Sequence, residues 1–172
     1  MVVFAKSDWV TFGILSSRFH ISWAVARGNF MGVGNDPRYT PSTTFETFPF
    51  PDGLTPNISA NDYTTDPYAQ IIATAACRLN ELRNNWLNPS NLVHRVSEVV
   101  PSYPDRILPV DSAAAEILKK RTLTNLYNER PAWLANAHRE LDAAVVAAYG
   151  WVEDISDEDA LAELFALNQA RS

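Results

Sequence analysis

Proline placement constrains the fold of this chain more than any other feature of its sequence. The 172 residues include 11 prolines, and a proline inside a helix removes a hydrogen bond and clashes with the preceding turn. Pro101, Pro104 and Pro109 therefore forbid a long helix in the segment around them. Pro67 and Pro131 suit the first turn of a helix, where no backbone hydrogen bond is lost. We expect a set of helices separated by extended or irregular segments.

The first segment predicts a helix from about residue 8 to Arg27. Asp8 is a suitable N-cap, and Gly28 is a suitable end. Apolar residues recur at spacings of three and four, as on one face of a helix. They are Phe12, Ile14, Leu15, Phe19, Ile21 and Trp23.

Short β segments are predicted around this helix, mainly between about residues 29 and 50. Alternating β-branched or aromatic residues indicate strands at 2–4, 30–33, 38–40 and 44–48, and the glycines and Pro37 of residues 32–37 indicate a turn. The Phe48-Pro49-Phe50-Pro51 run cannot be a central strand, because proline lacks the donor that a sheet needs. It is expected to be an extended exit segment.

The rest of the chain reads as helical. Helices are expected from Asp66 to about Trp86, from Asp111 or Ser112 to about Asn128, from Pro131 to Gly150, and after a cap at Ser156. The apolar face of the first is predicted to be Ile71, Ala75, Leu79, Leu82 and Trp86, with Cys77 a buried small side chain. The predicted fold is mainly α, with short β segments near the N-terminus followed by a small helical bundle. The predicted domains are residues 1–51, a linker at 52–65, and a helical domain at 66–172.

Charge and composition limit the possible functions. The net charge is −6, whereas a free-standing DNA-binding module is usually basic. Charges in residues 1–60 cancel, so this first part is the one expected to approach phosphate. A single cysteine excludes an internal disulfide. No signal peptide or membrane-spanning run is visible, so a cytoplasmic protein with no membrane partner is expected.

No catalytic, cofactor or metal motif is present in the sequence. Gly32-Val33-Gly34 lacks the third glycine and following helix of a dinucleotide loop. His20, His94 and His138 stand apart from other metal-ligand residues. Ser16 and His20 are one helical turn apart, but no oxyanion turn or orienting acid accompanies them. The acidic run at residues 153–159 lacks EF-hand spacing and suits a solvated helix start.

Polar side chains of the first segment remain as candidates for nucleic-acid contact. They are of the types that meet phosphates and base edges, although an exposed strand arginine with no such role is the competing interpretation. The candidates are Arg18, Arg27, Arg38, Tyr39, Thr43 and Thr44.

Two ordered runs resemble a known enzyme family. The first is Phe12-Gly13-Ile14-Leu15-Ser16-Ser17-Arg18-Phe19-His20, followed by Arg38-Tyr39 and by Thr44 to Pro51. The second is Leu123-Thr124-Asn125-Leu126-Tyr127-Asn128-Glu129-Arg130-Pro131-Ala132-Trp133-Leu134, continuing to Tyr149-Gly150-Trp151. Both resemble the end of class I, S-adenosylmethionine-dependent, adenine-specific DNA methyltransferases allied to single-chain Type IIG and Type IIL restriction–modification enzymes.

The resemblance implies the end of a target recognition domain followed by a helical C-terminal domain. The family's Asn-Pro-Pro-Tyr-like tetrapeptide and Gly-rich cofactor turn are absent, so the chain is expected to be a non-catalytic fragment. S-adenosylmethionine and the upstream methyltransferase domain would belong to the parent protein, through which double-stranded DNA would be bound. The alternative is a structural or interaction module of helices with no DNA contact.

Overall fold

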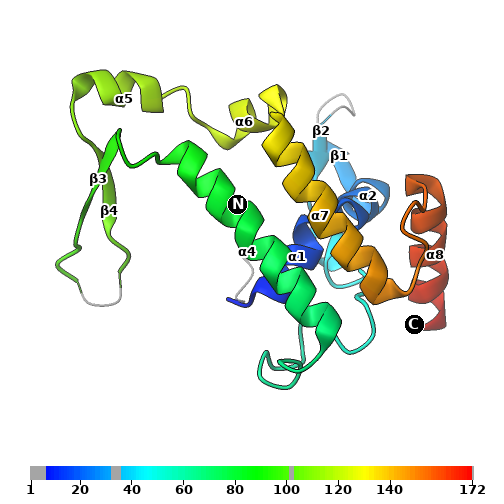
Figure 1. The fold of residues 1–172 in the computed structure, drawn as a ribbon. Helices are drawn as coiled ribbons and strands as arrows, with labels where there is room; N and C mark the ends of the chain where they lie inside the picture. The colour runs from blue at the N-terminus through cyan, green and yellow to red at the C-terminus, as the bar shows by residue number, and fades with distance from the viewer. Residues whose placement is uncertain (1–6, 32–35, 101–102, 172) are drawn as a thin grey trace. The chain divides into compact units, whose positions relative to one another are not determined.

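The fold is described from a computed structural model, which covers residues 7–31, 36–100 and 103–171. The helices are α1 (Trp9–Ser16), α2 (Arg18–Arg27), α3 (Pro41–Thr44), α4 (Pro67–Leu87), α5 (Ser112–Leu118), α6 (Leu123–Glu129), α7 (Ala132–Tyr149) and α8 (Asp157–Ala170). The strands are β1 (Asn29–Met31), β2 (Asp36–Arg38), β3 (Val93–Val96) and β4 (Arg106–Pro109). The mainly α fold with short strands near the N-terminus is confirmed (Figure 1).

The chain divides into two compact units. Unit 1 comprises residues 1–77 and 138–172, and unit 2 comprises residues 78–137. Helices α4 and α7 contribute residues to both. The domain limits expected from the sequence, at residues 1–51, 52–65 and 66–172, stay a prediction.

The expected N-terminal helix is divided in two at Ser17. This residue is buried and extended, with φ −75° and ψ 158°. Its hydroxyl donates to the Ile14 carbonyl at 2.7 Å, so the side chain bonds to backbone that a continuing helix would use. The prediction of one continuous helix was wrong. The expected ends are confirmed, since Asp8 Oδ1 accepts from the Thr11 amide at 2.7 Å and Gly28 follows the last residue.

Strands β1 and β2 form an antiparallel pair in which Asn29 faces Arg38. The strand expected at residues 44–48 is wrong, because Pro41 begins the single turn α3. Hydroxyls of Thr44 and Thr47 donate back to the carbonyls of Thr40 and Thr43 at 2.7 and 2.6 Å, which favours turns over a ladder. Beyond these turns, residues 48–51 are buried and form no strand. The strand expected at residues 2–4, and Val33 of the next, lie outside the described residues.

The core of unit 1 depends on close helix packing at Gly13. A Cβ added there would lie 2.7 Å from Ile72 Cγ2, 3.0 Å from Ala76 Cβ and 3.2 Å from Leu141 Cδ1. Helices α4 and α7 therefore pack directly on the backbone of α1. The predicted apolar face of α4 is partly wrong: Leu79 is fully buried as expected, but Ile71 is 54% exposed, and Ile72 and Ala76 are fully buried in place of Ile71 and Ala75. Cys77 is half-buried.

Unit 2 contains a hairpin that the sequence patterns did not predict. Strands β3 and β4 pair antiparallel, with Val93 facing Pro109 and Val96 facing Arg106. The helix expected from Asp111 or Ser112 to Asn128 is interrupted between α5 and α6. Asp111 and Thr122 each cap a separate helix, accepting from Ala114 and Asn125 amides at 2.7 and 3.1 Å.

Two further helix ends follow the expected local chemistry. Arg130, in the left-handed region with φ 41°, ends α6, and Pro131 disfavours a helical conformation at the residue before it. Ser156 caps α8, since its hydroxyl accepts from the Asp159 amide at 3.0 Å.

Candidate nucleic-acid interface

The six side chains predicted to contact DNA all lie in unit 1. Arg18 and Arg27 stand at opposite ends of α2, Arg38 ends β2, and Tyr39, Thr43 and Thr44 follow in the link to α3 and in α3 itself. The structure separates them into two groups: side chains that bond within the unit, and side chains that project from it.

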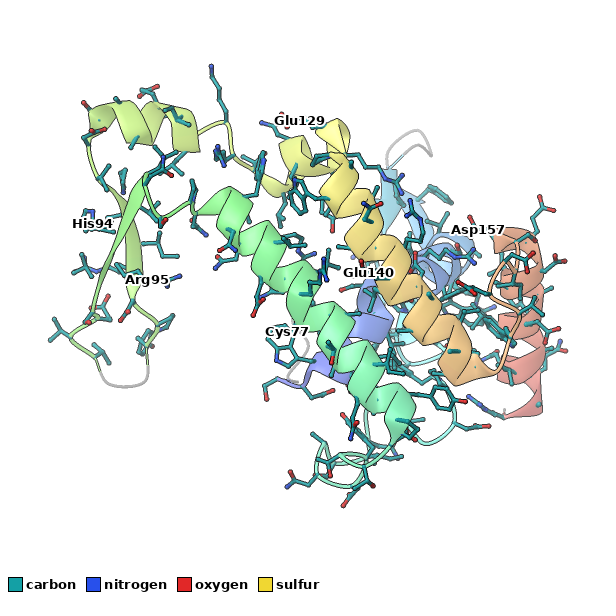
Figure 2. All side chains as sticks on the ribbon, viewed as in Figure 1. Cys77, His94, Arg95, Glu129, Glu140 and Asp157 are labelled. Carbon is teal, nitrogen blue, oxygen red and sulfur yellow. The ribbon has the colours of Figure 1, made fainter. Side chains whose placement is uncertain are left out.

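Arg18 belongs to the first group. Its guanidinium donates to the Ile155 carbonyl at 2.7 Å, lies 4.5 Å from the centre of the Phe19 ring, and is hydrogen-bonded to Asp157. Its backbone amide donates to Asp142 Oδ1 at 2.9 Å. Asp157 begins α8 (Figure 2), so Arg18 ties α2 to the C-terminal helices.

Tyr39, Thr43 and Thr44 are also bonded within the unit. The Tyr39 hydroxyl lies 2.9 Å from Nε2 of His20 and shares a hydrogen bond with the Thr44 hydroxyl. Thr44 is fully buried, and Thr43 donates to the Thr40 carbonyl at 3.2 Å. Burial raises the pKa of Tyr39 above its ordinary value, and the bond with Thr44 partly opposes this change.

Buried His20 lies beside this tyrosine. Its side chain is 4% exposed and its ring meets the Phe48 ring edge-to-face, with centres 4.7 Å apart. Desolvation lowers the pKa of His20 to about 4, so the ring is neutral at physiological pH. Among the described protein atoms, Nδ1 of His20 and Nε1 of Trp23 find no hydrogen-bond partner.

Arg27 and Arg38 form the second group. Both are exposed. An added Cβ at Gly28 would lie 2.5 Å from the Ala24 carbonyl oxygen and 3.1 Å from the Arg38 carbonyl oxygen. The end of α2 and the end of β2 therefore approach each other with only a glycine between them. This approach places the backbones of Arg27 and Arg38 together at the base of the β1–β2 hairpin.

Two residues that sequence reasoning missed complete this surface. Asn29 is exposed and faces Arg38 across the ladder, and Phe30 is 53% exposed. Arg27, Asn29, Phe30 and Arg38 are here called the hairpin surface. The available signal was the strand predicted at residues 30–33, which contains Phe30 and directly follows Asn29. A two-stranded ribbon fits the major groove of DNA, where arginine and asparagine read purine edges.

The C-terminal helices hold the segment that follows the hairpin. The Tyr149 hydroxyl donates to the Pro49 carbonyl at 3.0 Å, Asn168 Nδ2 to that of Thr47 at 2.8 Å, and Arg171 Nη1 to that of Phe50 at 2.6 Å. These three side chains satisfy carbonyls in a proline-containing segment that has few backbone partners of its own. The segment is thereby fixed against α7 and α8.

The described strand-to-helix links and acidic, histidine and cysteine side chains lack the features of an S-adenosylmethionine turn or a metal cluster. The links from β2 to α3 and from β4 to α5 contain no glycine, so neither fits the Gly-rich turn that S-adenosylmethionine would require. No group of three metal-binding side chains is gathered among the residues described. An open groove of about 490 Å³ is lined by residues 45–50, 55–57, 168 and 171, and Asn168 and Arg171 there are already bonded to backbone. No helix in the described chain has the length and apolar character to cross a membrane.

Comparison with known proteins identifies a fold relative. The sequence matches no protein-family profile, and no curated protein matches it. The structure is similar to that of the Type IIL restriction–modification enzyme MmeI, which was solved in complex with DNA. The TM-score is 0.55 at 22% identity, over 96% of this chain and 16% of MmeI. The likeness establishes the fold, and this chain spans about a sixth of its relative's length.

Proposed function

We propose that this chain is the recognition-side, non-catalytic segment of a site-specific DNA adenine-N6 methyltransferase of the restriction–modification type. The observation that carries the proposal is the hairpin surface, where Gly28 brings exposed Arg27 and Arg38 to the base of a two-stranded ribbon. The fold likeness to a segment of an enzyme solved with DNA supports the same assignment.

In this proposal the hairpin surface grips the duplex while methyl transfer takes place elsewhere in the parent protein. Arg27 and Arg38 would contact phosphates or guanine edges, and Asn29 would contact an adenine edge. Extruding the target adenine costs a few kcal/mol, which such contacts would offset. S-adenosylmethionine would bind outside this segment. Arg18, Thr43 and Thr44 would support the recognition segment from within, because their polar groups are bonded inside unit 1.

The test is an Arg38→Ala substitution in the full-length protein. We expect affinity for the preferred duplex to fall about 5- to 150-fold, which corresponds to a loss of about 1–3 kcal/mol for a base-reading arginine. If Arg38 contacts phosphate instead, all duplexes should be weakened alike and the slope of log K against log salt should fall by about 1. Filter binding at several salt concentrations distinguishes the two.

Arg139→Ala is the matched control, because it removes an exposed arginine of α7 that lies outside the hairpin surface. It should change affinity less than twofold. Equal binding by wild type and Arg38→Ala at every salt concentration would contradict DNA contact by this surface.

A second candidate function is a helical scaffold with no DNA contact. It is favoured by the internal bonding of four of the six predicted side chains. It is also favoured by the charge of unit 1, which carries six basic and fourteen acidic residues, a net charge of −8. This candidate predicts that Arg27→Ala and Arg38→Ala leave DNA binding unchanged, whereas Arg18→Ala weakens assembly of the parent protein.

A further inference from the structure

We propose that His20 and Tyr39 are a positioning pair that fixes the exit of the β1–β2 hairpin, so that His20 sets DNA site preference without touching DNA. This inference rests on the proposed function of the hairpin surface. It assigns Tyr39 a supporting role in place of the direct DNA contact that its sequence position suggested.

The geometry places the pair directly behind the hairpin surface. Tyr39 follows Arg38, the last residue of β2, and its hydroxyl lies 2.9 Å from Nε2 of His20. His20 in turn is held by the Phe48 ring against the interior of unit 1. A side chain anchored one residue beyond Arg38 limits the directions in which the Arg38 backbone can point.

Burial determines which atoms donate in this network. Neutral His20 carries one ring proton. If that proton were on Nδ1, a buried donor would be left without a protein partner, which is costly. The favoured tautomer therefore has the proton on Nε2, donated to the Tyr39 hydroxyl oxygen.

The network continues from Tyr39 to backbone. The Tyr39 hydroxyl shares a hydrogen bond with the Thr44 hydroxyl, and the Thr44 hydroxyl donates to the Thr40 carbonyl at 2.7 Å. The contacts thus run from His20 through Tyr39 and Thr44 to the Thr40 carbonyl. They join α2, the hairpin exit and α3 through partly buried hydrogen bonds.

The test combines Tyr39→Phe, which removes only the hydroxyl, with a matched control. Tyr63→Phe removes the hydroxyl of a second tyrosine of unit 1, which donates to Asp8 Oδ1 at 2.8 Å in a bond that is likewise partly buried. The first readout is amide hydrogen exchange of Asn29, Phe30 and Arg38 in the free full-length protein. We expect exchange at these amides to rise about fivefold or more in Tyr39→Phe, which loses the bonds to His20 and Thr44, and to stay unchanged in Tyr63→Phe.

The second readout is selection of bound sequences from a duplex library with a randomised centre. Tyr39→Phe and His20→Leu should each lower the ratio of preferred to random-duplex affinity about 5- to 10-fold, with random-duplex affinity unchanged. His20→Gln, which can still donate, should restore most of that ratio. Combining Tyr39→Phe with His20→Leu should add little, because both remove the same bond.

The outcomes separate the inference from the proposed function. A wild-type protein without any sequence preference contradicts the proposed function, and the exchange rates still decide whether His20 and Tyr39 anchor the hairpin. Unchanged exchange in Tyr39→Phe overturns the anchor. Altered exchange with unchanged sequence preference shows a stabilising bond alone and overturns the specificity role.

Discussion

At the scale of single residues, the arginines of unit 1 show how far residue type predicts function. Arg18, Arg27 and Arg38 are equivalent in composition, and each sits at the end of an element. The fold distinguishes them by their partners: Arg18 is bonded to Ile155 and Asp157, more than 130 positions along the chain. Arg27 and Arg38 are exposed, and the Arg27 guanidinium lies 5.6 Å from the centre of the Trp23 ring on its own helix. No local pattern encodes contacts over that separation, so the sequence could nominate all three but could not separate them.

His20 provides a prediction at this scale that depends on pH. Its folded-state pKa is about 4 against an ordinary value of 6.5, because burial disfavours the charged ring. Between these values the unfolded chain binds a proton that the folded chain does not, so the free energy of unfolding falls as the pH falls. The loss through this window should total about 3 kcal/mol and should level off below pH 4.

Urea denaturation of wild type and His20→Gln from pH 7 to pH 4 measures this contribution. The glutamine variant should lack it. Asp8 does not interfere: burial raises its pKa, but hydrogen bonds from Thr11 and Tyr63 lower it by more, and the net value lies below the ordinary 3.8. The stability that Asp8 contributes is therefore fully present above pH 3.8 and is lost only at lower pH. Parallel curves for the two proteins between pH 6.5 and 4 would contradict a buried neutral histidine.

At the scale of elements, the sequence predicted helices better than it predicted their interruptions. Caps at Asp8, Asp111 and Ser156 are local side-chain bonds, and all three are present. The breaks at Ser17 and between α5 and α6 depend on hydrogen bonds of the interrupting residues, which favour the start of a second helix over continuation of the first. Between α5 and α6, the Arg121 guanidinium donates to the Trp86 carbonyl at 2.5 Å and lies 5.2 Å from the centre of the Trp86 ring.

A substitution at Gly13 tests helix packing, because α1, α4 and α7 meet there. In an isolated helix, replacing glycine by alanine stabilises by about 1 kcal/mol. Here the new methyl would lie 2.7 Å from Ile72 Cγ2 and 3.0 Å from Ala76 Cβ, and neither is the end of a flexible side chain. Overpacking of this kind costs about 1–3 kcal/mol, so Gly13→Ala should destabilise by about 1 kcal/mol.

Thermal unfolding measures the effect of this substitution. The larger Gly13→Val should lower the midpoint further, since it adds two more methyl groups to the same contact. A higher midpoint in Gly13→Ala would mean that helix propensity outweighs packing and that the three helices do not approach this closely.

At the scale of the whole molecule, the two compact units carry net charges of opposite sign. Eight basic and six acidic residues lie at positions 78–137, a net charge of +2, while the rest of the chain carries −8. Counting charge separately in residues 1–60 and 61–172 missed this division, because unit 1 is built from both ends of the chain. Hairpin β3–β4 of unit 2 was equally hidden, since its prolines exclude a long helix but do not specify a strand pair.

The discontinuous unit 1 yields the last prediction. Around Gly13, Ala76 and Leu141 both lie within 3.2 Å of the same added Cβ position, so α4 and α7 are side by side close to the two junctions of unit 1, at Cys77 and His138. Replacing residues 78–137 by a short Gly-Ser linker should therefore leave unit 1 folded. It retains Trp9, Trp23 and Trp151, and Trp23 is fully buried against Phe48 and Phe165.

Near-UV circular dichroism and urea denaturation of this shortened chain provide the measurement. We expect one cooperative transition and a retained aromatic signal, because the contacts around Gly13, Trp23 and residues 47–50 all lie within unit 1. The His20→Gln difference between pH 6.5 and 4 should also persist in the shortened chain. Loss of cooperativity together with binding of a hydrophobic dye would mean that residues 78–137 are needed to complete the core, and that units 1 and 2 fold as one.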